Sequence, residues 1–277
     1  MGSTLLSPLL IFAEQTVWLC VAAGLMGLIV GSFLTVVAYR VPLPLMAQEP
    51  AESSTSTNSV PPFNIVWPGS HCPQCKTPLQ VWQNIPVVGY LLQKGRCSYC
   101  ADPISIRYPV IELTTALAFV GLAWHFGFGV QLALALVFAG FLVSLSAIDI
   151  EHYILPDSLT LSLLWLGLLA NTAGAFVPIE SAVWGAAFGY ASLWLIHHAF
   201  LWIRKKEGLG YGDFKLLAAI GAWLGVEALP WILFGAACLG AVVGVVGILA
   251  FKRDQDSPLP FGPFLSAAGF GALLLLF

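Results

Sequence analysis

Two aspartates adjoin long apolar stretches of the sequence, where charged side chains are costly and usually functional. Asp149 lies in the segment AIDIEHYILPD, and Asp213 lies in the segment GLGYGDFK. If the two share a site, one carboxyl group keeps its proton, because two neighbouring carboxylates repel each other. The ionised group can then activate water, while the protonated group polarises a peptide carbonyl and later protonates the leaving amine. This chemistry is peptide hydrolysis without a nucleophilic side chain.

The glycines before Asp213 fit this interpretation, because Gly210 and Gly212 let another backbone approach the carboxyl group closely. A simpler interpretation stands beside it, since an aspartate at a helix end can be a cap or a solvated boundary charge. Asp157 follows a Leu-Pro pair and precedes an apolar stretch, so we interpret it as a helix N-cap. For Glu112, a structural pairing with Arg107 one turn away is favoured over catalysis.

Four cysteines form two Cys-x-x-Cys pairs, Cys72 with Cys75 and Cys97 with Cys100, separated by 21 residues. Two such pairs can supply four thiolates to one tetrahedral zinc ion, and four protein ligands leave no open position for catalytic water. Two disulfides are the alternative, but a cytoplasmic location disfavours them. The spacing therefore predicts a structural zinc site.

The composition restricts the class of protein. Of the 277 residues, 58% are hydrophobic and only 9% are charged, with a net charge of −3, whereas a soluble domain has about 25% charged residues. This excludes a water-soluble enzyme, a disordered chain and a nucleic-acid binder with a basic face. We expect an all-α membrane protein of about eight transmembrane helices, with a small zinc-binding cytoplasmic insert after the first.

Eight apolar stretches could each cross a lipid bilayer. They cover residues 17–39, 109–126, 129–148, 158–176, 180–203, 214–229, 231–251 and 261–277. With the N-terminus outside, all eleven Lys and Arg residues fall on one side. Because basic residues concentrate in cytoplasmic loops, that side is the inside, and both aspartates lie at the inner membrane boundary.

The same patterns predict four regions. Residues 1–40 form the N-terminal span, and the Pro- and Ser-rich residues 41–70 form a flexible linker. Residues 71–108 form the cytoplasmic zinc-binding unit, and residues 109–277 form the membrane core that carries the aspartates.

The motifs together resemble the bacterial type IV prepilin peptidases, also called leader peptidase/N-methyltransferases. The resemblance rests on the paired Cys-x-x-Cys motifs after the first span, the segment from Asp149 to Leu-Pro-Asp157, and the Gly-x-Gly-Asp213 motif. The segments PISIRYP and PLPFGP also match this family, and the resemblance extends from about residue 30 to the end of the chain. The Gly-x-Gly-Asp element is also similar to that of intramembrane aspartyl proteases in general.

The resemblance implies an enzyme of the bacterial inner membrane that acts on prepilins and pseudopilins. Such enzymes cleave the leader peptide after a glycine at the cytoplasmic face and then methylate the new N-terminal residue with S-adenosylmethionine. The catalytic aspartates of the family correspond to Asp149 and Asp213, and its zinc ligands correspond to Cys72, Cys75, Cys97 and Cys100. The sequence identifies no residue that binds S-adenosylmethionine.

Two other functions remain as alternatives. A transporter could use the boundary carboxylates as a proton relay, although no convincing inverted repeat is visible. A zinc-bearing assembly scaffold would explain the cysteines but not the Gly-x-Gly-Asp213 motif.

Overall fold

The computed structural model describes residues 6–46, 69–205, 210–251 and 259–277. Within these ranges the chain is helical and contains no β-strand, apart from two isolated β-bridges. The longer helices are α1 (Leu6–Arg40), α4 (Arg107–Phe126), α5 (Val130–His152), α6 (Asp157–Thr172), α7 (Ile179–Arg204), α8 (Tyr211–Leu224), α9 (Leu229–Phe251) and α10 (Gly262–Leu276). Short helical segments are α2 (Leu43–Met46), η1 (Val81–Asn84), α3 (Val88–Leu92) and η2 (Val226–Ala228). The chain divides into two compact units, unit 1 (Met1–Leu132) and unit 2 (Ala133–Phe277).

Five of the described helices, namely α1, α4, α5, α7 and α9, are long and apolar enough to cross a membrane. Large apolar side chains on α7 and α9 are exposed, among them Trp184, Val242 and Leu249, as expected for helices that face lipid. The chain is therefore a polytopic helical membrane protein, and the predicted fold class is confirmed at this level.

The remaining predicted spans correspond to shorter helices. α6 has 16 residues, α8 has 14 and α10 has 15. α8 ends at Leu224, five residues before the predicted end at 229. The helix stops there because Gly225 adopts a φ of 81°, a conformation that favours glycine and terminates helices.

The predicted linker, residues 41–70, is described only at its two ends. Leu43–Met46 form the short helix α2, and the prediction for residues 47–68 lies outside the described residues.

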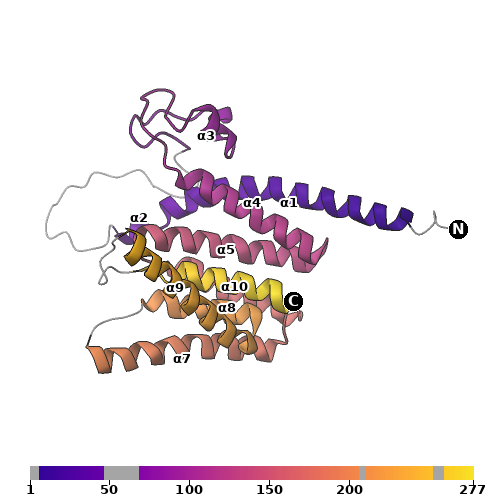
Figure 1. Ribbon diagram of the computed structural model, residues 1–277, viewed down its shortest axis with the longest axis vertical. Helices are drawn as coiled ribbons and strands as arrows, with labels where there is room; N and C mark the ends of the chain where they lie inside the picture. Colours follow the sequence, from indigo (N-terminus) through magenta and orange to yellow (C-terminus); the bar gives the residue numbers. More distant parts are fainter. Residues whose placement is uncertain (1–5, 47–68, 206–209, 252–258) are drawn as a thin grey trace. The chain divides into compact units, whose positions relative to one another are not determined.

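In unit 1, α1 packs closely along α4, and the two helices lie side by side in Figure 1. Gly27 and Gly31 of α1 permit this approach, since a Cβ at Gly27 would lie 2.6 Å from the Cα of Ala116. A Cβ at Gly31 would lie 2.7 Å from the Cα of Glu112. Small residues at helix contacts are the usual means of close packing in membranes.

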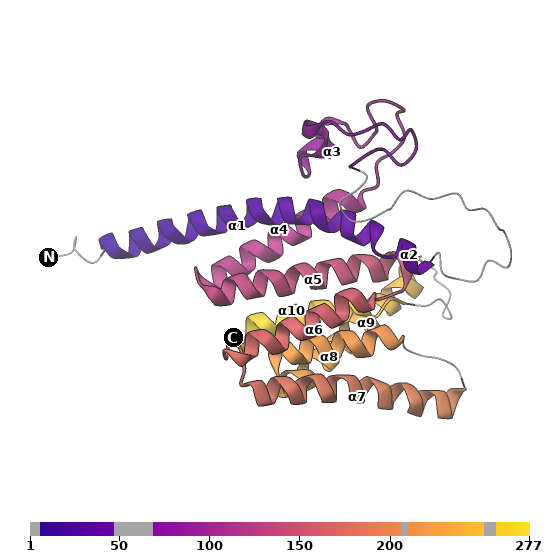
Figure 2. The same cartoon turned by 180° about the vertical axis from the view of Figure 1, so that it is seen from behind.

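In unit 2, α8 is the central helix. It packs against α6, α7 and α10, and every residue from Leu216 to Leu224 is buried. Figure 2 shows α7 running alongside α8. The two backbones meet at Gly185 and Gly221, where a Cβ on Gly221 would lie 2.3 Å from the carbonyl oxygen of Gly185.

Buried polar side chains fix the position of α8 relative to α6. The Nδ2 of Asn171 donates to the carbonyl oxygens of Ala222 and Trp223 at 2.9 and 3.0 Å. The indole N–H of Trp223 donates to the carbonyl oxygen of Leu163 at 2.8 Å. Because an unpaired polar group in this environment is costly, these bonds fix the rotation and depth of the helix that begins beside Asp213.

We expect Gly221→Ala to destabilise the protein by about 1–3 kcal/mol, the usual effect of overpacking a tight contact. The added methyl group would meet backbone atoms of α7, so the two helices would have to separate. The measurement is the thermal unfolding midpoint in detergent, followed by tryptophan fluorescence. Gly140→Ala in α5 is the matched control, because its Cβ would meet no atom within 4 Å. Equal unfolding midpoints for the two variants would contradict the prediction.

Candidate active site

Asp149 lies in the last turn of α5 and is only 5% exposed. Its Oδ2 accepts a hydrogen bond of 2.9 Å from the backbone N–H of Gly262, the first residue of α10. The first N–H groups of a helix have no partner within the helix, and its N-terminus favours negative charge. The start of α10 therefore holds this carboxyl group in a fixed orientation.

Asp213 is the third residue of α8 and is 7% exposed. Its Oδ2 accepts a hydrogen bond of 3.2 Å from the backbone N–H of Gly210, the N-cap residue of α8. Each aspartate is therefore anchored by a backbone N–H group at a helix start. Among the residues that the structure describes, no hydrogen bond occupies its second carboxyl oxygen, which can accept a proton or a hydrogen bond.

Leu155 connects the surroundings of the two aspartates. A Cβ on Gly212, the neighbour of Asp213, would lie 2.7 Å from the Cβ of Leu155. A Cβ on Gly262 would lie 2.8 Å from the Oδ2 of Asp149 and 3.3 Å from the Cδ2 of Leu155. Asp149 is also close enough to Asp213 for an electrostatic interaction between their two carboxyl groups. The end of α5, the start of α8 and the start of α10 thus converge around one leucine.

Two positions where these helices converge have room only for glycine, namely Gly212 and Gly262. Gly212 and Gly262 each lie where a methyl group would collide with Leu155 or with the carboxyl group of Asp149. Sequence reasoning considered Gly212 only for close approach of a substrate or partner, and it gave Gly262 no role. The signal that could have found Gly262 was the PLPFGP segment, which places a glycine at the start of an apolar helix.

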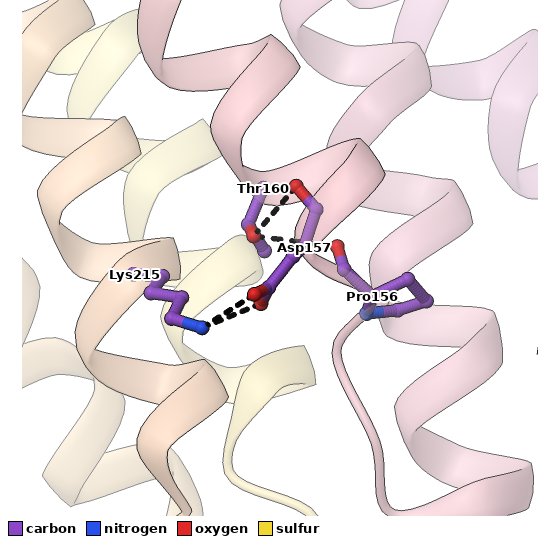
Figure 3. A network of polar contacts seen from close by, with 4 residues as sticks. All are labelled: Pro156, Asp157, Thr160 and Lys215. Atoms are coloured by element: carbon purple, nitrogen blue, oxygen red, sulfur yellow. Dashed lines mark hydrogen bonds and ion pairs between the residues drawn. The ribbon is translucent and has the colours of Figure 1, made fainter. Parts of the chain in front are cut away.

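Asp157 does not cap α6 in the way that the sequence suggested. The N-cap residue is Pro156, and Asp157 is the first helical residue. Both carboxylate oxygens of Asp157 accept hydrogen bonds from the Nζ of Lys215, at 2.6 and 2.8 Å (Figure 3). The Asp157 side chain is 59% exposed, so the pair contributes little to stability. It does link the first turn of α6 to the turn of α8 that carries Asp213.

Aromatic side chains surround the start of α8. His197 of α7 is 2% exposed, and its ring lies 5.4 Å from that of Tyr211 and 5.5 Å from that of Phe214. These contacts pack both neighbours of the Gly212-Asp213 pair against α7. Sequence reasoning gave His197 no role, because it adjoins His198 and two adjacent residues face different directions on a helix.

The four predicted metal-ligating cysteines come together in unit 1. One sulfur from each of Cys72, Cys75, Cys97 and Cys100 lies within 4.8 Å of the others, so the group could hold a metal ion. The two Cys-x-x-Cys turns have the same backbone structure. Lys76 donates its N–H to the carbonyl of Cys72, as Ala101 does to that of Cys97.

The donor set fits a divalent cation. Hydrogen bonds from the hydroxyl and the backbone N–H of Thr77 lower the pKa of the Cys75 thiol to about 6. Hydrogen bonds from the N–H groups of Cys100 and Tyr99 lower the pKa of Cys97. The N–H of Asp102 favours ionisation of Cys100, but burial and the neighbouring sulfurs outweigh it and raise its pKa to about 12. Thiolates at this separation repel one another, and a bound cation offsets that repulsion.

The fold and site thus define a polytopic membrane protein with two buried aspartates in one unit and a four-cysteine cluster in the other. The sequence model of the bacterial peptidase A24 N-terminal domain matches residues 25–126, and that of the type IV leader peptidase family matches residues 136–245. The boundary between these two matches coincides with the division between units 1 and 2.

Full-length relatives agree with the family models. The chain is 42% identical to the prepilin leader peptidase/N-methyltransferase of Stutzerimonas stutzeri, over 97% of this chain and 95% of that protein. It is 44% identical to the enzyme of that name from Pseudomonas aeruginosa (90% and 88%) and 46% identical to that from Pectobacterium carotovorum (93% and 94%). No solved structure shows significant similarity to the chain. The chain belongs to the type IV leader peptidase family, so the resemblance seen in its motifs is confirmed.

Proposed function

We infer that this protein is a prepilin peptidase and N-methyltransferase. It cleaves the leader peptides of type IV prepilins and pseudopilins after a glycine, and it then methylates the new N-terminal residue. The observation that carries the inference is the convergence of Asp149 and Asp213 around Leu155 in a chain of this family. Family membership does not favour the transporter alternative.

In the proposed cleavage step, Asp149 and Asp213 act on one peptide bond. The ionised carboxylate removes a proton from a water molecule, and the water oxygen attacks the peptide carbonyl. The protonated carboxyl group donates a hydrogen bond to the carbonyl oxygen, which stabilises the developing negative charge. The C–N bond then breaks and its nitrogen takes up a proton, which leaves a glycine carboxylate on the leader and a free amine on the mature pilin.

The proposed topology places this chemistry at the cytoplasmic face of the inner membrane. α1 and α4–α10 are taken as eight spans with the N-terminus outside, which puts all eleven basic residues inside. Asp149 ends one span and Asp213 begins another, so both lie at the same boundary. A prepilin has a basic leader in the cytoplasm and an apolar helix in the membrane, so its scissile bond lies at this level.

We propose that the cysteine cluster binds zinc and organises residues 71–108, which contain little apolar core of their own. Four cysteine sulfurs within 4.8 Å of one another are the donor set of a closed structural zinc site. The linker at 41–70 and the membrane core at 109–277 complete the proposed organisation. Bound zinc would supply folding free energy and hold the two Cys-x-x-Cys turns together.

Full-length protein is expected to co-purify with about one zinc ion per chain, the stoichiometry of a site with four cysteine ligands. The double variant Cys72→Ser/Cys75→Ser should lose the metal and unfold at a lower temperature, because two of four ligands are removed. Metal is measured by mass spectrometry of the purified protein. Cys20→Ser/Cys238→Ser is the matched control, since both residues lie on helices outside the cluster. Metal-free wild-type protein of full stability would refute the zinc site.

The test of the proposed function uses purified protein in detergent, a synthetic prepilin and S-adenosylmethionine labelled on its methyl group. We expect two products by mass spectrometry: a leader peptide that ends in glycine and a mature chain that carries one labelled methyl group. An intact prepilin after prolonged incubation would refute the peptidase, and an unmethylated mature chain would refute the transferase.

A further inference from the structure

Unit 1 contains a cavity that neither Asp149 nor Asp213 lines. It has a volume of about 910 Å³, which falls within the range of about 300–1,000 Å³ that is typical of small-molecule sites. It is lined by the second half of α1, the cysteine-bearing segment and the first turns of α4. Three segments that are distant in the sequence therefore line a space large enough for a nucleoside.

Glu112 gives the cavity a buried carboxyl group. This residue is 6% exposed and lines the cavity. Its Oε2 accepts a hydrogen bond of 2.7 Å from the backbone N–H of Val87, and Ser32 also donates to its carboxyl group. A carboxylate accepts about four hydrogen bonds, so its remaining lone pairs can accept hydroxyl or amino groups of a ligand.

The backbone beside Glu112 is strained in a way that fixes this carboxylate. Val87 has a φ of 59°, a conformation that is a clear outlier for a β-branched residue. The N–H of this strained residue is the one that points at Glu112. The chain thus keeps an unfavourable backbone conformation at the point where the cavity wall holds its buried carboxylate.

Aromatic rings supply the rest of the cavity wall. Phe33 and Tyr39 of α1 and Tyr108 of α4 all line the cavity, and all three residues are exposed. Such rings stack on a purine base and attract a nearby cation through their π-faces. Aromatic faces together with a buried carboxylate fit a purine nucleoside that carries hydroxyl groups and a positive charge.

We propose that this cavity binds S-adenosylmethionine, with the carboxylate of Glu112 and the ring of Tyr39 as recognition groups. S-adenosylmethionine has an adenine ring, a ribose with two hydroxyl groups, and a sulfonium cation, and the cavity offers a complementary group for each. The inference rests on the methyl-transfer half of the proposed function, to which the sequence assigned no residue.

The test is equilibrium binding of S-adenosylhomocysteine, the demethylated product, to full-length protein in detergent by isothermal titration calorimetry. Loss of one charge-assisted hydrogen bond in Glu112→Gln is expected to raise the Kd roughly 10-fold or more. Tyr39→Leu is expected to weaken binding in the same direction. Tyr39 is 48% exposed, so this variant remains informative if Glu112→Gln fails to fold. Glu180→Gln is the matched control and should bind like wild type, because Glu180 lies in unit 2.

Prepilin cleavage by the wild-type preparation is measured in parallel, so that the two hypotheses can fail separately. Wild-type protein that cleaves prepilin and transfers methyl groups, with both variants binding S-adenosylhomocysteine as tightly as wild type, would overturn the assigned site but not the function. Wild-type protein that cleaves prepilin and does not bind S-adenosylhomocysteine would overturn the inference together with the transferase half of the function.

Discussion

Asp213→Asn is expected to reduce prepilin cleavage by about 10³-fold, within the range of about 10²–10⁴ that positioned acid–base groups contribute. The asparagine keeps the size of the side chain and can still accept the hydrogen bond from Gly210. It cannot exchange a proton with water or with the leaving amine. The measurement is kcat/KM for a synthetic prepilin, with products separated by mass.

Asp149→Asn is expected to cause a loss of the same size, since the proposed step uses both carboxyl groups. Asp157→Asn is the matched control, because its carboxylate belongs to an exposed ion pair with Lys215. We expect this control to retain activity within a few-fold of wild type and to unfold at nearly the wild-type temperature. An Asp213→Asn or Asp149→Asn enzyme with wild-type kcat/KM would remove that residue from the mechanism.

Gly262→Ala is expected to reduce kcat/KM by about 10²-fold, the loss that a displacement of about 1 Å in a catalytic group can cause. The new methyl group would lie 2.8 Å from the Oδ2 of Asp149 and 3.3 Å from Leu155. Because Gly262 also donates the hydrogen bond that orients Asp149, the carboxyl group must move or lose this bond. The effect should appear mainly in kcat, since the substituted residue orients a reacting group.

Gly271→Ala provides the control for Gly262→Ala. Both glycines lie in α10, but a Cβ at Gly271 would meet no atom within 4 Å. The control should cleave prepilin at the wild-type rate. If Gly262→Ala were equally active, the contact between α10 and Asp149 would have no part in positioning the carboxyl group.

Sequence alone located the cysteine cluster well, because a Cys-x-x-Cys pair fixes the separation of its two sulfurs. The two pairs are 21 residues apart, and their sulfurs lie within 4.8 Å of one another, as predicted. The spacing of Cys72 and Cys75 is a local property of the chain. No contact between distant helices had to be known to predict it.

The arrangement of the two aspartates was more difficult to predict from the sequence, because their convergence depends on how the helices pack. Sequence placed Asp149 at the end of one helix and Asp213 at the start of another, and both positions agree with the structure. It could not reveal that Gly262, more than a hundred residues after Asp149, donates the hydrogen bond that orients it. Such a contact depends on how the start of α10 lies against the end of α5, which the apolar pattern of any single helix does not encode.

The lengths of the helices and the presence of the cavity also could not be predicted from the apolar pattern alone. An apolar stretch predicts a span but not its end, and the run after Asp213 stops at Leu224 because Gly225 takes a left-handed conformation. The cavity beside Glu112 is built from three segments, so no local motif marks it.

If Asp149 and Asp213 form one catalytic unit, single-turnover cleavage of prepilin by the double variant Asp149→Asn/Asp213→Asn will reveal it. Residues that act as a unit show strongly non-additive losses. We therefore expect the double variant to cleave prepilin no more slowly than the slower of the two single variants. A double variant whose loss equals the product of the two single losses would show that the aspartates act independently and do not form one catalytic unit.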